Sequence, residues 1–142
     1  FGKYENWKAT FISGACCKAV KNLPITIRQN VYFDYLYIKD FCNIIKWFLD
    51  KKPKYHEYNI VSGKKIDLIT LAEMVKEVSG KDVDVFICNE GLGKEYTADN
   101  TRLKNEIKGL ELTCLKDAIK DLYMWYENNE NIIDMESLLY NN

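Results

Sequence analysis

The sequence predicts a mixed α/β (α+β) fold, and three observations support this prediction. Several segments place apolar residues at the three- and four-residue spacing of a helix face. Between them lie short runs of β-branched and aromatic residues, which are typical of strands. Helical and extended patterns alternate along the chain, which favours layers of helix packed against sheet. The chain has 142 residues, of which 47% are apolar and 29% charged, so we expect residues 1–142 to form one globular domain.

The first part of the chain predicts a helix and two extended segments. Residues 7–20 carry apolar side chains at helical spacing, and Gly14 allows close packing there. Residues 23–27 are expected to be extended, because the position before a proline disfavours the α conformation. Residues 31–38 are the strongest strand pattern in the sequence, with Asp34 as the polar exception on one face.

A second helix is expected directly after this strand. Asp40 is predicted to be its N-cap, since an aspartate side chain accepts a hydrogen bond from a first-turn N–H. The apolar stripe runs to Phe48, and the Lys-Lys-Pro sequence at 51–53 ends the helix. Residues 58–61 then predict a short strand closed by Ser-Gly.

The third helix shows both an initiation and a termination signal. Thr70 and Glu73 have the spacing of a capping box, and Gly80 is placed to close the helix in the left-handed region. A strand is expected at 83–88, and a polar loop at 89–101.

The last long helix is predicted to start at a Thr113 cap. Its buried stripe comprises Leu115, Ile119, Leu122 and Tyr126. The tail from Asn128 is rich in Asn and Glu and is expected to fray. Alternatively, a short helix docks through the apolar residues Ile132, Ile133, Leu138 and Leu139.

Cysteine usage and the single histidine argue against disulfides and against a metal site. The cysteines are Cys16, Cys17, Cys42, Cys88 and Cys114. They form no CxxC pair, and His56 lies in a charged stretch where a surface position is expected. Free cysteines indicate a reducing compartment, and hence the cytoplasm.

Charge and hydropathy exclude further classes of partner. The formal net charge is −1, so no global basic field is available to bind nucleic acid or an anionic membrane. No apolar run reaches the ~18 residues of a membrane span. The sequence starts at Phe1, without a Met, a cap or a leader. We expect that this position lies inside a longer protein.

Motifs for catalysis and cofactor binding are missing from the sequence. There is no GxGxxG turn, no P-loop and no GxSxG elbow. Arg28 and Arg102 are the only arginines, and arginine is the preferred bidentate partner of phosphate. Each is therefore a candidate phosphate ligand, with a surface salt bridge as the alternative.

A family resemblance emerges from several segments taken together. The segment NVYFDYLYIKDFCNIIKWFL resembles the "(R)D-aromatic-(V/I/L)-(Y/H)-V-x-D" motif and following helix of the extended short-chain dehydrogenases/reductases, which include the NAD(P)-dependent nucleotide-sugar epimerases and dehydratases. YNIVSGKKIDLITLAEMVKEVSGK is similar to their "YN-(V/I/L)-G-(S/T)-G" strand and subsequent helix. GLGKEYTADNTRLKNEI and TCLKDAIKDLYMWYENN are similar to their "AD-x-S-K" stretch and last helix. The resemblance spans residues 1–128 in family order.

The resemblance implies the C-terminal part of a Rossmann-type enzyme. This part would be a small substrate-binding subdomain plus edge strands of the parent sheet, formed by 31–38 and 58–61. The glycine-rich NAD(P) turn and the Tyr-x-x-x-Lys pair of the family lie upstream of it, in an N-terminal Rossmann domain that this sequence does not include. NAD or NADP is thus expected in the full-length parent and not on this chain, which should have no catalytic residue and no activity alone.

The same resemblance implies a set of substrate-binding positions. The helix containing Trp7, Lys8 and Phe11 matches one beside the sugar-nucleotide pocket, and Thr26 lies in the segment that faces the base. Phe33 stands where many members carry an arginine for the substrate diphosphate. Candidate replacements for the missing phosphate ligands are Arg28, Lys94 and Arg102.

The expected ligand is therefore a nucleotide-diphosphate sugar, with a homodimer covering the sheet edges that the missing domain leaves exposed. Two alternatives remain open. The chain is a stand-alone, non-catalytic binding or interaction module, or it is part of a nucleotide-sugar reductase of the same superfamily.

Overall fold

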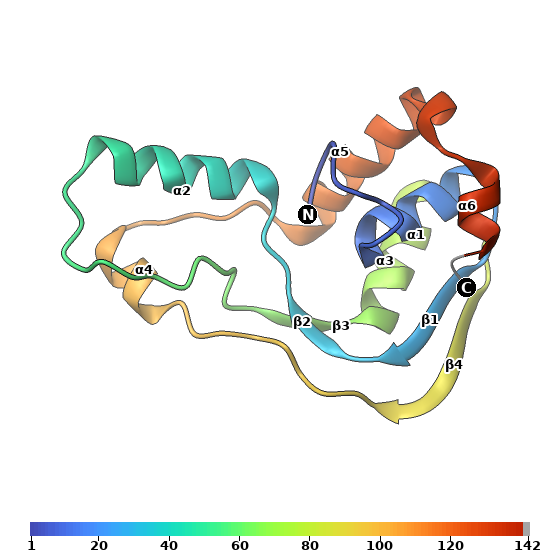
Figure 1. The fold of residues 1–142 in the computed structure, drawn as a ribbon, viewed down its shortest axis with the longest axis horizontal. Helices are drawn as coiled ribbons and strands as arrows, with labels where there is room; N and C mark the ends of the chain where they lie inside the picture. Colours follow the sequence, from blue (N-terminus) through green and yellow to red (C-terminus); the bar gives the residue numbers. More distant parts are fainter. Residues whose placement is uncertain (141–142) are drawn as a thin grey trace.

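A computed structural model describes residues 1–140 and confirms the mixed α/β class. Its elements are α1 (Phe11–Val20), β1 (Ile25–Asn30), β2 (Tyr32–Asp34), α2 (Ile38–Asp50), β3 (Lys65–Asp67), α3 (Leu68–Ser79), β4 (Val85–Leu92), α4 (Thr101–Glu106), α5 (Leu115–Asn128), the 3₁₀ turn η1 (Glu130–Ile132) and α6 (Met135–Tyr140). Figure 1 shows a body in which α1, α3, α5 and α6 lie near β1 and β4, and an arm in which α2 and α4 extend away from that body.

The core of the body lies between three helices and the strand pair. α1, α3 and α5 contact one another, and their fully buried side chains include Ile12, Leu71 and Ile119. Gly14 faces a close neighbour, because a Cβ at this position would lie 3.0 Å from the Trp7 carbonyl oxygen. The close packing predicted for Gly14 is therefore confirmed. Helix α1 itself begins at Phe11, later than expected, since residues 7–9 form turns.

The strands β1 and β4 form a parallel pair. Ile25 and Ile27 of β1 are buried toward the helices, whereas Thr26 and Arg28 alternate to the other face. The pairing continues past residue 88, where the strand predicted at 83–88 was expected to end, with Gln29 opposite Asn89. The predicted loop at 89–101 is therefore wrong at both ends, because β4 extends to Leu92 and α4 begins at Thr101.

The strand predicted at 31–38 is largely wrong. Only Tyr32–Asp34 pairs, antiparallel to β3, and the chain enters α2 at Ile38. The carboxylate of Asp34 then accepts hydrogen bonds from the N–H and hydroxyl of Ser62 and from the N–H of Gly63, at 2.6–2.7 Å. The polar exception in the strand pattern thus anchors a neighbouring turn.

Residues 58–61 do not form the predicted strand. No described strand pairs with this segment, and unpaired extended backbone is not stabilised as sheet. Tyr58 instead packs on Phe48 of α2, with ring centroids 4.9 Å apart. β2 pairs antiparallel with β3 and also forms a single parallel bridge between Phe33 and Tyr96, so in the described residues the 31–38 segment contributes one short strand and 58–61 contributes none.

The three predicted N-caps are wrong, because other residues take these positions. Asp40 lies inside the first turn of α2, whose N-cap is Tyr37. Thr70 is not the N-cap of α3, because Asp67 takes that position and accepts from the Thr70 N–H at 3.1 Å. Cys114, rather than Thr113, is the N-cap of α5. The Gly80 prediction is confirmed, with φ +64° at the C-cap of α3.

The C-terminal segment docks on the body, as the second of the two tail predictions states. Ile133 and Leu138 are buried in the main core, while Ile132 and Leu139 are exposed. Within residues 1–140, no helix has the length and apolarity that a membrane crossing requires.

Candidate ligand-binding site

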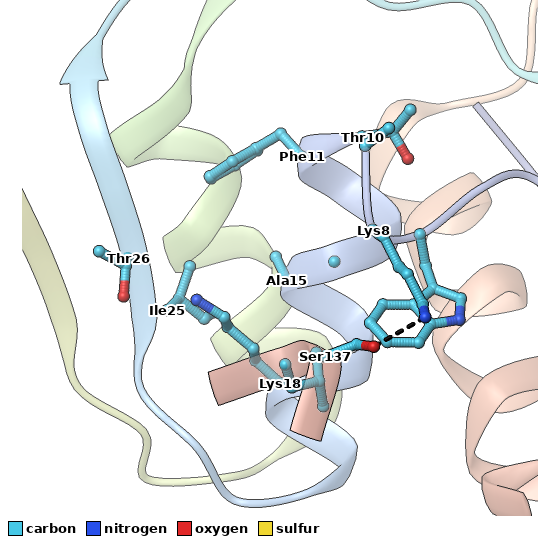
Figure 2. A pocket seen from close by; sticks show the side chains of 12 residues that line it. Lys8, Thr10, Phe11, Ala15, Lys18, Ile25, Thr26 and Ser137 are labelled. Atoms are coloured by element: carbon cyan, nitrogen blue, oxygen red, sulfur yellow. Dashed lines mark hydrogen bonds between the residues drawn. The ribbon is translucent and has the colours of Figure 1, made fainter. Parts of the chain in front are cut away.

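Four predicted positions line one pocket of about 210 Å³. Trp7, Lys8 and Phe11 come from the turn before α1 and its first residue, and Thr26 comes from β1. Lys18 of α1 and Ser137 of α6 complete the walls (Figure 2). The pocket therefore gathers residues from three separate regions of the sequence around one hollow.

Local hydrogen bonds shape the turn that carries Trp7 and Lys8. The side-chain oxygen of Asn6 accepts from the Lys8 N–H at 3.2 Å, and the Asn6 carbonyl accepts from the Ala9 N–H at 3.0 Å. An asparagine side chain commonly closes a turn in this way. The turn brings the Lys8 ammonium 5.3 Å from the centre of the Trp7 ring, within cation–π range.

Two lysines border the pocket, and their environments differ. Lys8 is exposed, and its ammonium donates to the Ser137 hydroxyl at 2.7 Å (Figure 2). Lys18 is buried, and burial lowers the pKa of its ammonium. The pocket thus combines aromatic surface with hydrogen-bonding cations, a composition suited to a polar ligand with a flat apolar part.

Sequence reasoning missed Lys18 and Ser137 as pocket residues. Lys18 follows Trp7, Phe11 and Gly14 at helical spacing, so a lysine on that stripe was the available signal. Ser137 had no such signal, because only the docking of α6 brings it to the pocket.

The other predicted site residues lie apart from this pocket. Arg28 is exposed and shares a strand face with Thr26, while Lys94 is exposed beyond the end of β4. Phe33 packs against Tyr35 and Tyr96.

Arg102 lies on α4 in the arm (Figure 1). Its guanidinium donates to the Glu57 carbonyl at 3.0 Å and stacks over the Tyr55 ring. The structure therefore does not bring Arg28, Lys94 and Arg102 together.

A second cavity of about 450 Å³ lies between the body and the arm. Tyr35, Tyr37 and Lys64 line it, together with Asp40 and Thr113. It was not predicted, because it forms only where three distant segments meet. Asp40 accepts two hydrogen bonds from Thr113 there, so this carboxylate already has protein partners.

The described residues offer no metal centre, and the two buried cysteines are not activated thiols. Within residues 1–140, no three His, Cys, Asp or Glu side chains are grouped closely enough to hold a metal ion. All five cysteines are free. Burial raises the pKa of Cys17 to about 12 and that of Cys16 further still, so both remain neutral thiols at neutral pH.

The comparisons with known proteins show similarity of structure only. No family model and no curated protein matches the sequence. A GDP-L-fucose synthetase from Naegleria fowleri matches with a TM-score of 0.78 and 16% identity over 93% of this chain and 44% of its own. A dTDP-glucose 4,6-dehydratase from Bacillus anthracis, in complex with NAD, matches with a TM-score of 0.75 and 20% identity over 93% of this chain and 43% of its own. A UDP-glucose 4-epimerase from Thermotoga maritima, with UDP-glucose, matches with a TM-score of 0.77 and 19% identity over 92% of this chain and 44% of its own.

The chain has the fold of the C-terminal portion of an extended short-chain dehydrogenase/reductase. It spans less than half the length of the epimerases and dehydratases that it matches. TM-scores of 0.75–0.78 establish the fold of this portion despite the low identities, and the structure therefore confirms the fold class that the sequence resemblance implies.

The described residues do not fit a dinucleotide cofactor. A dinucleotide pyrophosphate requires a glycine-rich turn between a strand and the N-terminus of a helix. Gly91 lies within β4, and the chain after Gly93 continues without a helix until Thr101.

Proposed function

We propose that this chain is the substrate-binding portion of an NAD(P)-dependent epimerase or dehydratase that acts on nucleotide-diphosphate sugars. The observation that carries the proposal is the convergence of Trp7, Lys8, Phe11 and Thr26 on one pocket. The matched enzymes from Naegleria, Bacillus and Thermotoga are named for GDP-, dTDP- and UDP-linked sugars. A pocket with aromatic walls and lysine donors suits a nucleoside with its sugar or phosphate.

Catalysis would depend on groups that this chain does not supply. A cofactor performs the hydride chemistry of such enzymes, and the protein contributes binding and orientation. The role of the described residues is thus to hold and orient the substrate. We expect that the chain alone gives no change in nicotinamide absorbance when it is mixed with NAD or NADP and a nucleotide sugar.

Calorimetric titration of the chain with UDP-glucose, dTDP-glucose and GDP-fucose tests the proposal. We expect binding of at least one of them, weakened about tenfold or more by Phe11→Ala, because this change removes an aromatic wall. Leu49→Ala is the control, since Leu49 is exposed on α2 in the arm. Binding that Phe11→Ala leaves unchanged would place the ligand elsewhere, for example in the larger cavity.

Arg28 and Arg102 are proposed to take the place of the phosphate ligands that the sequence lacks, although they lie far apart in the fold. Arg28 shares a strand face with Thr26, and we expect Arg28→Ala to weaken nucleotide-sugar binding in the full-length enzyme. Arg102 is engaged with Glu57 and Tyr55. If neither Arg28→Ala nor Arg102→Ala changes the affinity, the idea of a replaced phosphate clamp is wrong.

The remaining alternatives give different results in the same titrations. A stand-alone binding or interaction module would fold and bind none of the nucleotide sugars. A nucleotide-sugar reductase portion would bind them, and only the full-length enzyme would reveal net oxidation of the reduced cofactor.

We also propose that a second copy of this chain pairs along β4. β1 covers one edge of this strand, and Phe86, Ile87 and Leu92 are exposed on it. An exposed apolar edge strand is a template for pairing with another strand. Sedimentation velocity should show a dimer that Ile87→Lys dissociates; a monomer at all concentrations contradicts this proposal.

A further inference from the structure

The C-terminal segment forms a fixed wall of the pocket. Ile133 and Leu138 are buried in the main core on either side of the Asp134 turn. Lys21 of the body pairs with Glu130 at 3.1 Å at the start of this segment. α6 then places Ser137 and Leu138 on the pocket. The sequence resemblance ends at residue 128, so this wall is a feature of this chain beyond the resembling segments.

The wall carries a carboxylate that is linked to Lys8. The Lys8 ammonium donates to the Ser137 hydroxyl at 2.7 Å, and this hydroxyl in turn donates to Asp134 at 2.5 Å. The Asp134 carboxylate also lies 3.6 Å from the Lys8 ammonium. The hydrogen bond from Ser137 holds the pKa of Asp134 below its usual range. Asp134 is therefore charged at neutral pH.

A lysine ammonium that is already paired with a carboxylate attracts an anion less strongly than an unpaired ammonium does. A phosphate placed against Lys8 would lie within a few ångströms of the Asp134 carboxylate, and like charges at this distance repel. An uncharged hydroxyl or carbonyl avoids this repulsion and still accepts a hydrogen bond from the ammonium. The geometry therefore separates two classes of group at the Lys8 side of the pocket.

We propose that Asp134 is a specificity-determining residue, which makes the Lys8 side of the pocket accept an uncharged oxygen of the ligand, on the base or a sugar, and disfavour a phosphate. This inference rests on the proposed function, since it concerns the orientation of a nucleotide ligand in that pocket. Ser137 acts as a positioning residue, because it connects Lys8 to the carboxylate.

Calorimetry with uridine and UDP, and with guanosine and GDP, tests the inference. We expect Asp134→Asn to raise the ratio of diphosphate affinity to nucleoside affinity about two- to five-fold, the effect of one partly exposed charge. Lys8→Met should weaken nucleoside and diphosphate by the same factor. Asp82→Asn is the matched control, because Asp82 is an exposed carboxylate that pairs with Lys76 away from the pocket.

The outcomes separate the inference from the function. An equal ratio of diphosphate to nucleoside affinity in wild type and Asp134→Asn, with binding retained, overturns the inference alone. A loss confined to the diphosphates in Lys8→Met also overturns it, because Lys8 would then be a phosphate ligand. Failure of wild type to bind any of the probes overturns the proposed function and this inference with it. Near-identical circular dichroism and thermal unfolding of the variants show that the fold is retained.

Discussion

The carboxylate of Asp40 accepts two hydrogen bonds from Thr113, a residue 73 positions away in the sequence. One comes from the Thr113 N–H at 3.0 Å and the other from its hydroxyl at 2.8 Å. Asp40 lies in the first turn of α2, and Thr113 directly precedes the N-cap of α5. This pair therefore connects the arm to the body on the wall of the larger cavity.

Removal of this connection should destabilise the fold. Asp40→Ala leaves two donors of Thr113 without their acceptor, and we expect a loss of about 1–3 kcal/mol in the free energy of unfolding. Asp50→Ala, at the exposed end of the same helix, should stay within about 0.5 kcal/mol of wild type. Urea denaturation measures both. Equal effects of the two variants would contradict a specific role for the Asp40–Thr113 pair.

Two glycines with positive φ allow the steric cost of an added side chain to be distinguished from the conformational cost of the left-handed backbone. Gly80 has φ +64° with open space around it, whereas at Gly63, with φ +72°, a Cβ would lie 2.5 Å from the Asn100 side-chain oxygen. We expect Gly80→Ala to cost about 1 kcal/mol, for the left-handed backbone alone. Gly63→Ala should cost about 1–3 kcal/mol more, because Asn100 is buried and donates to the Val61 carbonyl. Thermal unfolding of the two variants checks this order, and the reverse order refutes it.

The hydroxyl of Tyr126 is buried, and within residues 1–140 no hydrogen bond of standard geometry reaches it, although the side chains of Ser13 and Cys17 lie close by. An unsatisfied buried polar group destabilises the folded state. We therefore expect Tyr126→Phe to raise the free energy of unfolding by about 1 kcal/mol. Tyr123→Phe on the same helix is the comparison, since the Tyr123 hydroxyl donates to Glu127 at 3.1 Å. Loss of the Tyr123 hydroxyl should lower the free energy of unfolding. If chemical denaturation shows that Tyr126→Phe destabilises the protein more than Tyr123→Phe, the Tyr126 hydroxyl is not unsatisfied.

Stability at acid pH should depend on Asp121. The hydrogen bond from the Tyr37 hydroxyl, with smaller contributions from Lys39 and Lys3, holds the pKa of Asp121 below its usual range against partial burial. A carboxyl whose pKa is lowered on folding stabilises the protein above its unfolded pKa of about 3.9. This stabilisation is lost as the pH falls through the folded pKa.

The midpoint of thermal unfolding between pH 7 and pH 2 measures this effect. Asp121→Asn should melt below wild type at pH 7, and the difference should vanish toward the acid end. Glu111→Gln, an exposed change before α5, serves as the control. A difference between wild type and Asp121→Asn that stays constant over this range would falsify the linkage.

Most of the helices were predictable from periodicity, because each presents an apolar stripe to one of two hydrophobic clusters. The stripes of α1, α3 and α5 contain the side chains that the structure buries, such as Ile12, Val75 and Leu122. The N-caps were not predictable, because several polar residues near each helix start are chemically able to cap. Asp67 rather than Thr70 caps α3 because its carboxylate reaches the Thr70 N–H.

The candidate site divides in the same manner. Trp7, Lys8, Phe11 and Thr26 were identified from the sequence resemblance, and the structure brings these four together. Arg102 could not be placed in advance, because its position depends on how the arm folds. Its contacts with Tyr55 and Glu57 form between segments some 45 residues apart.

The sequence alone determined the helices α1, α2, α3 and α5, most of the apolar residues that face the core and that no dinucleotide turn is present, since all three depend on residue type and short-range spacing. Tertiary structure decided where extended segments become strands, because a strand requires a partner for its backbone groups. It also decided that Asp40 anchors α5, and that α6 places Ser137 and Asp134 beside Lys8. These contacts join residues far apart in the chain, and only the packing of the core brings them within hydrogen-bonding distance.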